Sequence, residues 1–218
     1  MEPIAHIRTQ FPTKFGIPRQ AGLVPELTGE IIFEPAYRNP DALRGLEGFS
    51  HLWLLWEFSE AKRTQWSPTV RPPRLGGNVR MGVFATRSPF RPNPIGLSCV
   101  KLEGIGLEMP SLLVSGADLM DGTPIFDIKP YLPYCDCHPE ATGGFTATHG
   151  KAPLEVVFPP ETELPPHVRT SLYGVLAQDP RPQYQSDSSR VYGFSFAGYG
   201  IRFRVEKNIL TVLEVFPD

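Results

Sequence analysis

The chain has 218 residues, a length expected for one domain or for one domain plus a small appendage. Hydrophobic residues make up 41% and charged residues 20%, which indicates a globular protein, and the formal net charge is −2. Its 25 prolines argue against a helical bundle, because a proline inside a helix costs about 3 kcal/mol. A transmembrane helix needs about 20 consecutive apolar residues and a signal peptide needs an apolar core, and the sequence shows neither.

Short alternating or apolar runs predict strands along most of the chain. The expected strands cover residues 29–37, 51–58, 79–86, 97–102, 111–119, 125–131, 154–158, 200–206 and 209–216. A short helical turn capped by Asp41 is expected at 41–46, and a longer helix at 165–177 that starts with prolines. Prolines predict ordered loops at 66–78 and 88–96, and Lys207-Asn208 predicts a tight hairpin turn.

These elements predict a mainly β protein with an antiparallel β-barrel, because closure removes exposed strand edges. We expect two domains, a barrel at 1–150 and a small C-terminal α+β unit of helix plus hairpin at 151–218. No G-x-G-x-x-G follows a strand, and neither a Walker A motif nor G-x-S-x-G is present. A Rossmann-type cofactor site is therefore not expected.

Cysteine usage favours a reduced, cytoplasmic protein. Cys99, Cys135 and Cys137 are few and odd in number, so a disulfide framework is not expected. The run from Cys135 to His138 resembles a fragment of a metal site, but zinc needs four ligands and His149 alone cannot complete the set. We expect no bound metal.

Positive charge is concentrated in one stretch. Residues 61–102 contain no Asp or Glu, and they carry Lys62, Arg63, Arg71, Arg74, Arg80, Arg87, Arg91 and Lys101. Such a stretch favours a polyanion partner, and its arginines suit forked contacts to phosphate or carboxylate. The alternative is a set of solvated or ion-paired loop charges. Phe90 in this stretch is expected to be exposed and able to stack on an unpaired base, whereas Trp53 and Trp56 are expected in the core.

A second constellation is acidic. Asp118, Asp121 and Asp127 fall in one short segment with Lys129 and Tyr131. Turn chemistry explains Asp121, whose side chain can bond to its own backbone. The functional alternative is a set of hydrogen-bond acceptors near a polar ligand, one of which could act as a general base, and the two explanations of Asp127 stay open. Lys129 is placed to pair with Asp127 on one strand face.

Two long motifs carry a resemblance that covers essentially the whole chain. VRPPRLGGNVRMGVFATRSPFRPNPIG at 70–96 and GADLMDGTPIFDIKPYLPY at 116–134 are similar to the TrmO family, also called TsaA-like or YaeB. Supporting segments are IPRQ at 17–20, FSHLW at 49–53 and DPRP at 179–182. The resemblance implies a non-Rossmann β-barrel methyltransferase that uses S-adenosylmethionine (AdoMet). Its implied substrate is N6-threonylcarbamoyladenosine at position 37 of threonine tRNAs, and it implies a homodimer with the active region close to the subunit interface.

The resemblance also assigns residues. The implied AdoMet contacts are Pro18, Arg19, Gln20, Phe58, Ser59, Arg87, Leu97, Leu119, Met120, Asp121 and Gly122. The implied tRNA contacts are Arg71, Arg74, Arg80, Arg91, Lys129 and Arg181. Asp179, Arg181 and Tyr184 are expected to reach the partner subunit's site. Ser59 departs from the family, whose members often carry His at this position.

Asp121 and Asp127 are the candidate bases for the N6 proton, with bulk water as the alternative. Two other functions compete with the methyltransferase. One is a non-catalytic RNA-binding barrel that uses the same arginines, and the other is an AdoMet-binding regulator without a tRNA surface.

Overall fold

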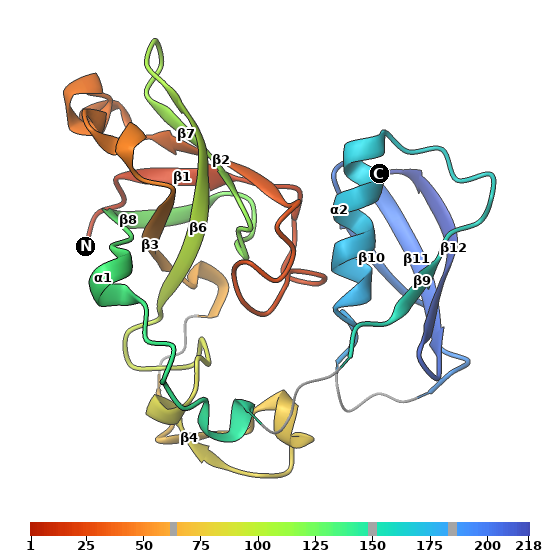
Figure 1. Cartoon of the computed structure of the whole chain (residues 1–218). Helices are drawn as coiled ribbons and strands as arrows, with labels where there is room; N and C mark the ends of the chain where they lie inside the picture. The colour runs from red at the N-terminus through yellow and green to blue at the C-terminus, as the bar shows by residue number, and fades with distance from the viewer. Residues whose placement is uncertain (62–64, 148–151, 183–186) are drawn as a thin grey trace.

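A computed structural model describes residues 1–61, 65–147, 152–182 and 187–218. The chain forms a barrel lobe and a C-terminal lobe that lie side by side (Figure 1). Most regular elements are strands, which confirms the predicted mainly β fold. None of the described helices is long and apolar enough to cross a membrane.

Six antiparallel strands form a closed barrel in the order β1-β2-β7-β6-β3-β8. The strands are β1 (Ala5–Arg8), β2 (Thr28–Phe33), β3 (His51–Glu57), β6 (Ile95–Gly106), β7 (Ser111–Ser115) and β8 (Thr123–Pro130). Pairing of β1 with β8 closes the barrel, with Ala5 opposite Ile125. Burial alternates along β3, so Leu52, Leu54 and Trp56 face the interior while the residues between them face outward. The predicted strand at 51–58 is confirmed, but one face of it is buried rather than both.

Short helices and a two-stranded ribbon decorate the barrel. The ribbon pairs β4 (Thr69–Val70) with β5 (Met81–Gly82), so the strand expected at 79–86 is much shorter. The single-turn helices are Pro35–Tyr37, Pro40–Leu43, Leu46–Gly48, Ser59–Ala61, Pro73–Leu75, Val83–Ala85, Gly144–Thr146 and α1 (Pro133–Asp136). The prediction that Asp41 caps this helical turn was wrong. The cap of Pro40–Leu43 is Asn39, whose side chain accepts a hydrogen bond from the Asp41 amide at 3.0 Å.

The C-terminal lobe packs one helix against a four-stranded sheet. The helix α2 (Pro166–Ala177) accompanies β9 (Glu155–Val157), β10 (Tyr192–Phe196), β11 (Tyr199–Glu206) and β12 (Ile209–Pro217). The strand order is β10-β11-β12-β9. The predicted hairpin turn is confirmed, and Lys207 adopts the left-handed conformation (φ 53°) between β11 and β12.

The long connection from β1 to β2 belongs structurally to both lobes (Figure 1). Its residues Phe11, Val24 and Leu27 are buried in the hydrophobic cluster that contains α2 and β10–β12. A Cβ atom on Gly174 would lie 2.6 Å from Val24 Cγ1, so only glycine lets α2 come this close. The domain boundary expected at 150/151 stays a prediction, but the described lobes share this packed connection.

Candidate functional site at one end of the barrel

The barrel topology brings three connections together. Strands β1, β7 and β3 end, and β2, β8 and β6 begin, at the same end of the barrel, because neighbouring strands are antiparallel. The connections at this end are therefore 9–27, 116–122 and 58–94. They contain all the residues that the sequence assigned to AdoMet except Leu97, which lies on β6 itself.

A side-chain contact joins two of these connections. The guanidinium of Arg87, on 58–94, donates a hydrogen bond to the amide oxygen of Gln20, on 9–27. Arg87 is exposed, so it is accessible to an anionic ligand as well. The structure thus brings together two predicted cofactor residues that are 67 positions apart in the chain.

A buried hydrogen-bond chain lies beneath this contact. The indole Nε1 of Trp56 donates to Ser98 Oγ at 3.0 Å, and Ser98 Oγ donates to Asp118 Oδ1 at 2.5 Å. The Asp118 carboxylate also accepts from the backbone amide of Ala21 and is within electrostatic range of Arg87. Asp118 therefore connects the barrel interior to both loops that carry predicted site residues.

Asp118 is not an ordinary surface carboxylate. Burial raises its pKa above the usual aspartate value, while the hydrogen bonds from Ser98 and Ala21 and the charge of Arg87 oppose the increase. We did not assign Asp118 to the site from the sequence. The available signal was its position between Ala117 and Leu119, both of which are buried.

The indole of Trp56 packs directly against the backbone of Gly96, which has no side chain. A Cβ atom on Gly96 would lie 2.2 Å from Trp56 Cε2 and 2.4 Å from Cζ2, so the indole occupies the space that any other residue would fill. Phe58 also packs against the indole, with ring centroids 4.2 Å apart. Trp56 is buried as predicted, whereas Trp53 is half-buried on the outward face of β3, so its expected place in the core was wrong.

The turn Leu119–Gly122 is bonded firmly to β1 and the connection after it. The amides of Asp121 and Gly122 donate to the carbonyls of Phe11 and Ile7, both at 2.8 Å, so these two amides serve the fold. Asp121 Oδ1 accepts from the Thr9 amide at 2.9 Å. Asp121 is exposed at the site end of the barrel, and its carboxylate bonds to the Thr9 amide rather than to its own turn, which differs from the turn role expected from the sequence.

Asp127 lies elsewhere, on the outer wall. It pairs across β3 with Leu55, whose other neighbour is Leu97 on β6. Asp127 Oδ2 forms an ion pair with Lys129 Nζ at 2.8 Å, as its position on the strand suggested. Leu97 is 53% exposed on this wall. Asp127 and Leu97 thus both lie beside Leu55 on the outer wall, and Leu97 directly precedes Ser98 of the hydrogen-bond chain.

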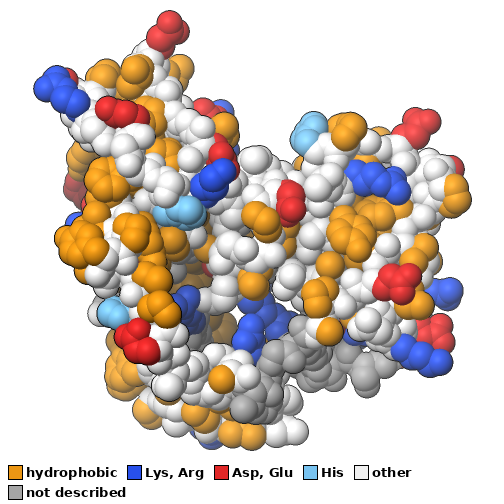
Figure 2. Space-filling model, in the orientation of Figure 1, with side chains coloured by type: hydrophobic (Ala, Val, Ile, Leu, Met, Phe, Trp, Pro, Cys, Tyr) orange, Lys and Arg blue, Asp and Glu red, His pale blue; other side chains and the backbone are white. Residues whose placement is uncertain are grey.

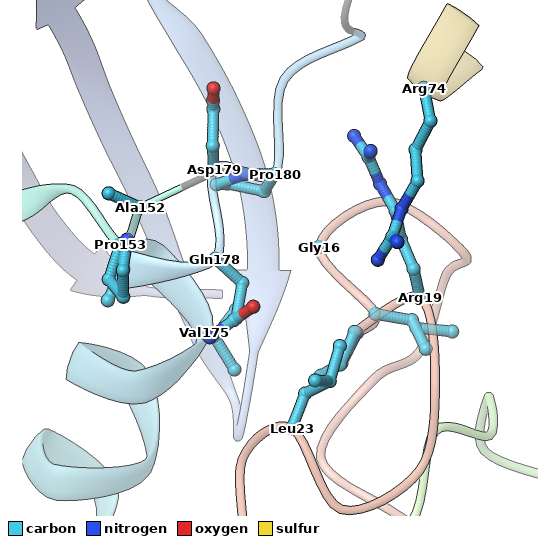
Figure 3. A pocket seen from close by; sticks show the side chains of 13 residues that line it. Gly16, Arg19, Leu23, Arg74, Ala152, Pro153, Val175, Gln178, Asp179 and Pro180 are labelled. Carbon is cyan, nitrogen blue, oxygen red and sulfur yellow. The ribbon is translucent and has the colours of Figure 1, made fainter. Parts of the chain in front are cut away.

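Arginines gather where the 9–27 connection meets the C-terminal lobe (Figure 3). Arg19 and Arg74 line one side of a pocket of about 100 Å³, and Asp179 lines the other. Arg181 makes two hydrogen bonds to Asp179, at 2.8 and 3.1 Å, and its carbonyl contacts Arg19 at 3.5 Å. Partial burial lowers the pKa of the Arg19 guanidinium, an effect that Asp179 opposes and the charge of Arg74 increases. Two cationic groups thus share one small pocket.

The remaining predicted phosphate contacts differ in whether their side chains also form hydrogen bonds within the protein. Arg91 donates to the carbonyls of Thr86 and Ser88, at 3.1 and 3.4 Å, and Arg80 donates to Thr69 Oγ1 at 2.9 Å. Arg71 is exposed. Figure 2 shows Lys and Arg side chains in the hollow between the two lobes.

Three further predictions concern single residues. Ser59 begins a single helical turn directly after Phe58, whose amide donates to the Pro94 carbonyl at 2.8 Å. Phe90 is 38% exposed. Tyr184 lies outside the described residues.

Comparisons with known proteins agree over the whole chain. A family model described as "tRNA-methyltransferase O N-terminal domain" matches residues 6–137, and the "TrmO C-terminal domain" matches residues 151–218. The chain belongs to the TrmO family. The resemblance read from the two sequence motifs is thereby confirmed.

Several relatives of this TrmO-family chain are similar over most of its length. A tRNA (adenine(37)-N6)-methyltransferase of Escherichia coli is 44% identical over 94% of this chain and 92% of its own length. One of the same name from Eikenella corrodens is 49% identical over 75% of this chain and 95% of its own length. A putative S-adenosylmethionine-dependent methyltransferase of Pseudomonas aeruginosa is 40% identical over 99% of this chain and 96% of its own length. A crystal structure of TrmO from Pseudomonas aeruginosa superposes with a TM-score of 0.80 and 34% identity, covering 98% of this chain and 97% of that one.

The side chains at the barrel end suit AdoMet as the cofactor of this TrmO-family chain. AdoMet carries a carboxylate, an ammonium group and a sulfonium, and Arg87, Gln20 and Asp118 offer a cation, an amide and a carboxylate within one network. In contrast, the described residues contain no group of three or more His, Cys, Asp or Glu side chains that could hold a metal ion. His149 lies outside those residues.

Proposed function

We propose that this chain is an AdoMet-dependent methyltransferase that adds a methyl group to N6 of adenine 37 in tRNA. The finer substrate is threonylcarbamoyladenosine in threonine tRNAs. The supporting observation is that relatives named for this reaction align with nearly the whole chain, while the barrel end gathers the polar network of Arg87, Gln20 and Asp118.

The chemistry sets a modest demand on the protein. The N6 nitrogen lies between an adenine ring and a carbamoyl carbonyl, so its lone pair is delocalised and it is a weak nucleophile. AdoMet, when bound, supplies a methyl group already activated by the sulfonium. The protein's main task is therefore to hold nucleophile, methyl and sulfur in line, which is catalysis by proximity and orientation.

We assign the orienting role to the network at the barrel end. The Trp56–Ser98–Asp118 chain is rooted in the barrel core, and Asp118 fixes the Ala21 amide beside Gln20 and faces Arg87. A group held by the core resists displacement better than one held by a loop alone. Arg87 binds an anionic group of cofactor or substrate from this support.

Of the two candidate bases, Asp121 is the better placed. It lies in the 116–122 connection at the site end of the barrel, whereas Asp127 is paired with Lys129 on the outer wall. One oxygen of Asp121 accepts the Thr9 amide, and the other is available to a substrate proton. Transfer of that proton to bulk water remains the competing route.

The tRNA is held by the basic residues. Arg19 and Arg74 place two cations in one pocket, with Asp179 already paired to Arg181. A phosphate of the anticodon stem-loop would satisfy both guanidinium groups. We further propose a cytoplasmic homodimer. The exposed apolar side chains Ile95 and Leu97 on the outer barrel wall are consistent with a subunit contact.

The deciding experiment uses purified protein, isotope-labelled AdoMet and two preparations of tRNA. One preparation comes from cells that make threonylcarbamoyladenosine and the other from cells that cannot. Nucleosides are then resolved by mass spectrometry. Methyl transfer only to the modified tRNA supports the proposal, and equal transfer to both retains the methyltransferase but rejects the nucleoside. AdoMet binding without transfer would favour a regulator, and tRNA binding without AdoMet would favour an RNA-binding barrel.

A further inference from the structure

Two large aromatic side chains lie on the surface beside the site, outside the residues assigned to cofactor or tRNA. Trp66 is 52% exposed and Phe84 is 73% exposed. Their ring centroids are 6.2 Å apart and their planes are inclined by 29°, so the two rings stack on each other while both remain exposed to solvent. We call this pair the aromatic platform.

The β4–β5 ribbon and the buried Val83 side chain hold the platform at the surface. The β4–β5 ribbon, with Thr69 opposite Gly82, brings the segment before β4 next to the segment after β5. The Val83 amide donates to the Pro68 carbonyl at 2.9 Å, and the Val83 side chain is fully buried. Val83 therefore anchors a single helical turn whose next residue, Phe84, projects into solvent.

The sequence segment that carries the platform is cationic. Trp66 and Phe84 both belong to the 61–102 stretch, which has no Asp or Glu. Arg80 on the ribbon donates to Thr69 Oγ1 at 2.9 Å, which fixes a guanidinium on the same small structure. Exposed rings with positive charge around them match single-stranded nucleic acid, whose bases stack on aromatic faces while its phosphates contact the cations.

The platform is also close to the site. Phe84 precedes Arg87 by three residues, so their Cα atoms are at most about 11 Å apart. A base on the platform would belong to the same short run of unpaired nucleotides as the base that reacts.

We propose that Trp66 and Phe84 form a stacking platform for an unpaired base of the RNA loop that contains the target adenine. This inference rests on the proposed function, because it takes the tRNA loop as the ligand. It assigns the platform to loop recognition rather than to phosphate binding, so it contributes contact that does not depend on salt. A competing explanation is that the two rings are a contact with a second protein molecule.

The test measures binding of a synthetic anticodon stem-loop RNA and of a fully paired duplex with the same stem. The variants are Trp66→Leu and Phe84→Leu, which remove the rings, and Trp66→Phe, which keeps one. Tyr173→Leu is the matched control, because Tyr173 is an exposed aromatic residue on α2 in the other lobe. The salt dependence of binding, AdoMet affinity and the mass of the particle in solution are measured for each protein.

We expect Trp66→Leu and Phe84→Leu each to weaken stem-loop binding about fivefold or more. Duplex binding, the salt slope, AdoMet affinity and particle mass should stay unchanged, and Trp66→Phe and Tyr173→Leu should bind like the wild type. Equal losses on both RNAs would overturn the platform. Unchanged RNA binding by the leucine variants would also overturn the platform. If their particle mass fell at the same time, the two rings would be identified as a contact with a second protein molecule.

Methyl transfer by the wild-type protein separates this inference from the proposed function. If the wild type methylates tRNA but the leucine variants bind the stem-loop normally, the platform alone is rejected. If the wild type does not methylate but the variants lose loop binding, the platform is supported and the proposed reaction is rejected.

Discussion

Gly96→Ala tests whether the barrel core supports the cofactor site. The new methyl group would lie 2.2–2.5 Å from three atoms of the Trp56 indole, so the ring must move. Overpacking a core costs about 1–3 kcal/mol. Moving the indole also breaks its 3.0 Å hydrogen bond to Ser98, which adds about 1 kcal/mol. We therefore expect a loss of about 2–4 kcal/mol in the free energy of unfolding.

The assay is urea unfolding followed by tryptophan fluorescence, because Trp53 and Trp56 both lie on β3 in the barrel. Binding of AdoMet is measured in parallel by calorimetry. Ser98 loses its indole donor and Asp118 loses a well-oriented neighbour, so AdoMet affinity should fall together with stability.

Gly104→Ala is the matched control on the same strand. A Cβ atom there would meet Leu113 Cβ at 3.9 Å, which is an ordinary contact. Its stability should change by less than about 1 kcal/mol. Should Gly96→Ala unfold at the same urea concentration as Gly104→Ala and bind AdoMet like the wild type, the link between core and site would be refuted.

Three other substitutions test single interactions. Arg87→Ala should lower methyl transfer at least about tenfold while changing stability by no more than about 0.5 kcal/mol, since the side chain is exposed; unchanged turnover would remove Arg87 from the site. Asp118→Asn tests the pH dependence of stability. Folding raises the pKa of Asp118, so the protonated carboxyl is favoured in the folded protein. The stability that Asp118 contributes is therefore present below its unfolded pKa and is lost as the pH rises through its folded pKa. The variant should therefore lose less stability than the wild type between the ordinary aspartate range and neutral pH, while binding AdoMet more weakly; an equally steep decline in urea unfolding would contradict this. Asp179→Asn keeps a residue tolerant of φ 52° but removes the charge from a pair whose side chains are only 12% and 13% exposed. It should cost about 1.5–3 kcal/mol in thermal unfolding, whereas Asp41→Asn, in a pair that is 78% and 72% exposed, should cost no more than about 1 kcal/mol; equal losses would count against the buried pair.

Local patterns predicted most of the strands. The apolar run at 51–58, the helix after Pro165 and the turn at Lys207-Asn208 all formed as expected, because burial, proline placement and turn chemistry act within a few residues. Three strands were missed, and one of them, β4, has only two residues and lies in the stretch expected to be a loop. β10 places Tyr192, Phe194 and Phe196 on its buried face, and this alternation in the sequence is itself typical of a half-buried strand. β1 has four residues, too few for alternation to stand out.

The candidate site was predicted less completely. The motifs named the Arg87 segment and IPRQ, but only the fold shows that Arg87 contacts Gln20. Asp118 was not predicted because its environment comes from Ser98, Ala21 and Arg87, none of which adjoins it in the sequence. Asp121 and Asp127, six residues apart, were both predicted as candidate bases. A turn followed by a strand places one at the barrel end and the other on the outer wall.

The pairing of β1 with β8 has a consequence for how the protein is made. The barrel closes only when Ala5 pairs with Ile125, and this contact spans more than half the chain. Contacts of such sequence separation form late, since a long loop must be ordered first. During synthesis from the N-terminus, the edges of β1 and β3 stay open to other partners until β8 has emerged. The turn at 116–122 then locks onto Ile7 and Phe11, so the catalytic end becomes organised in the same step that seals the barrel.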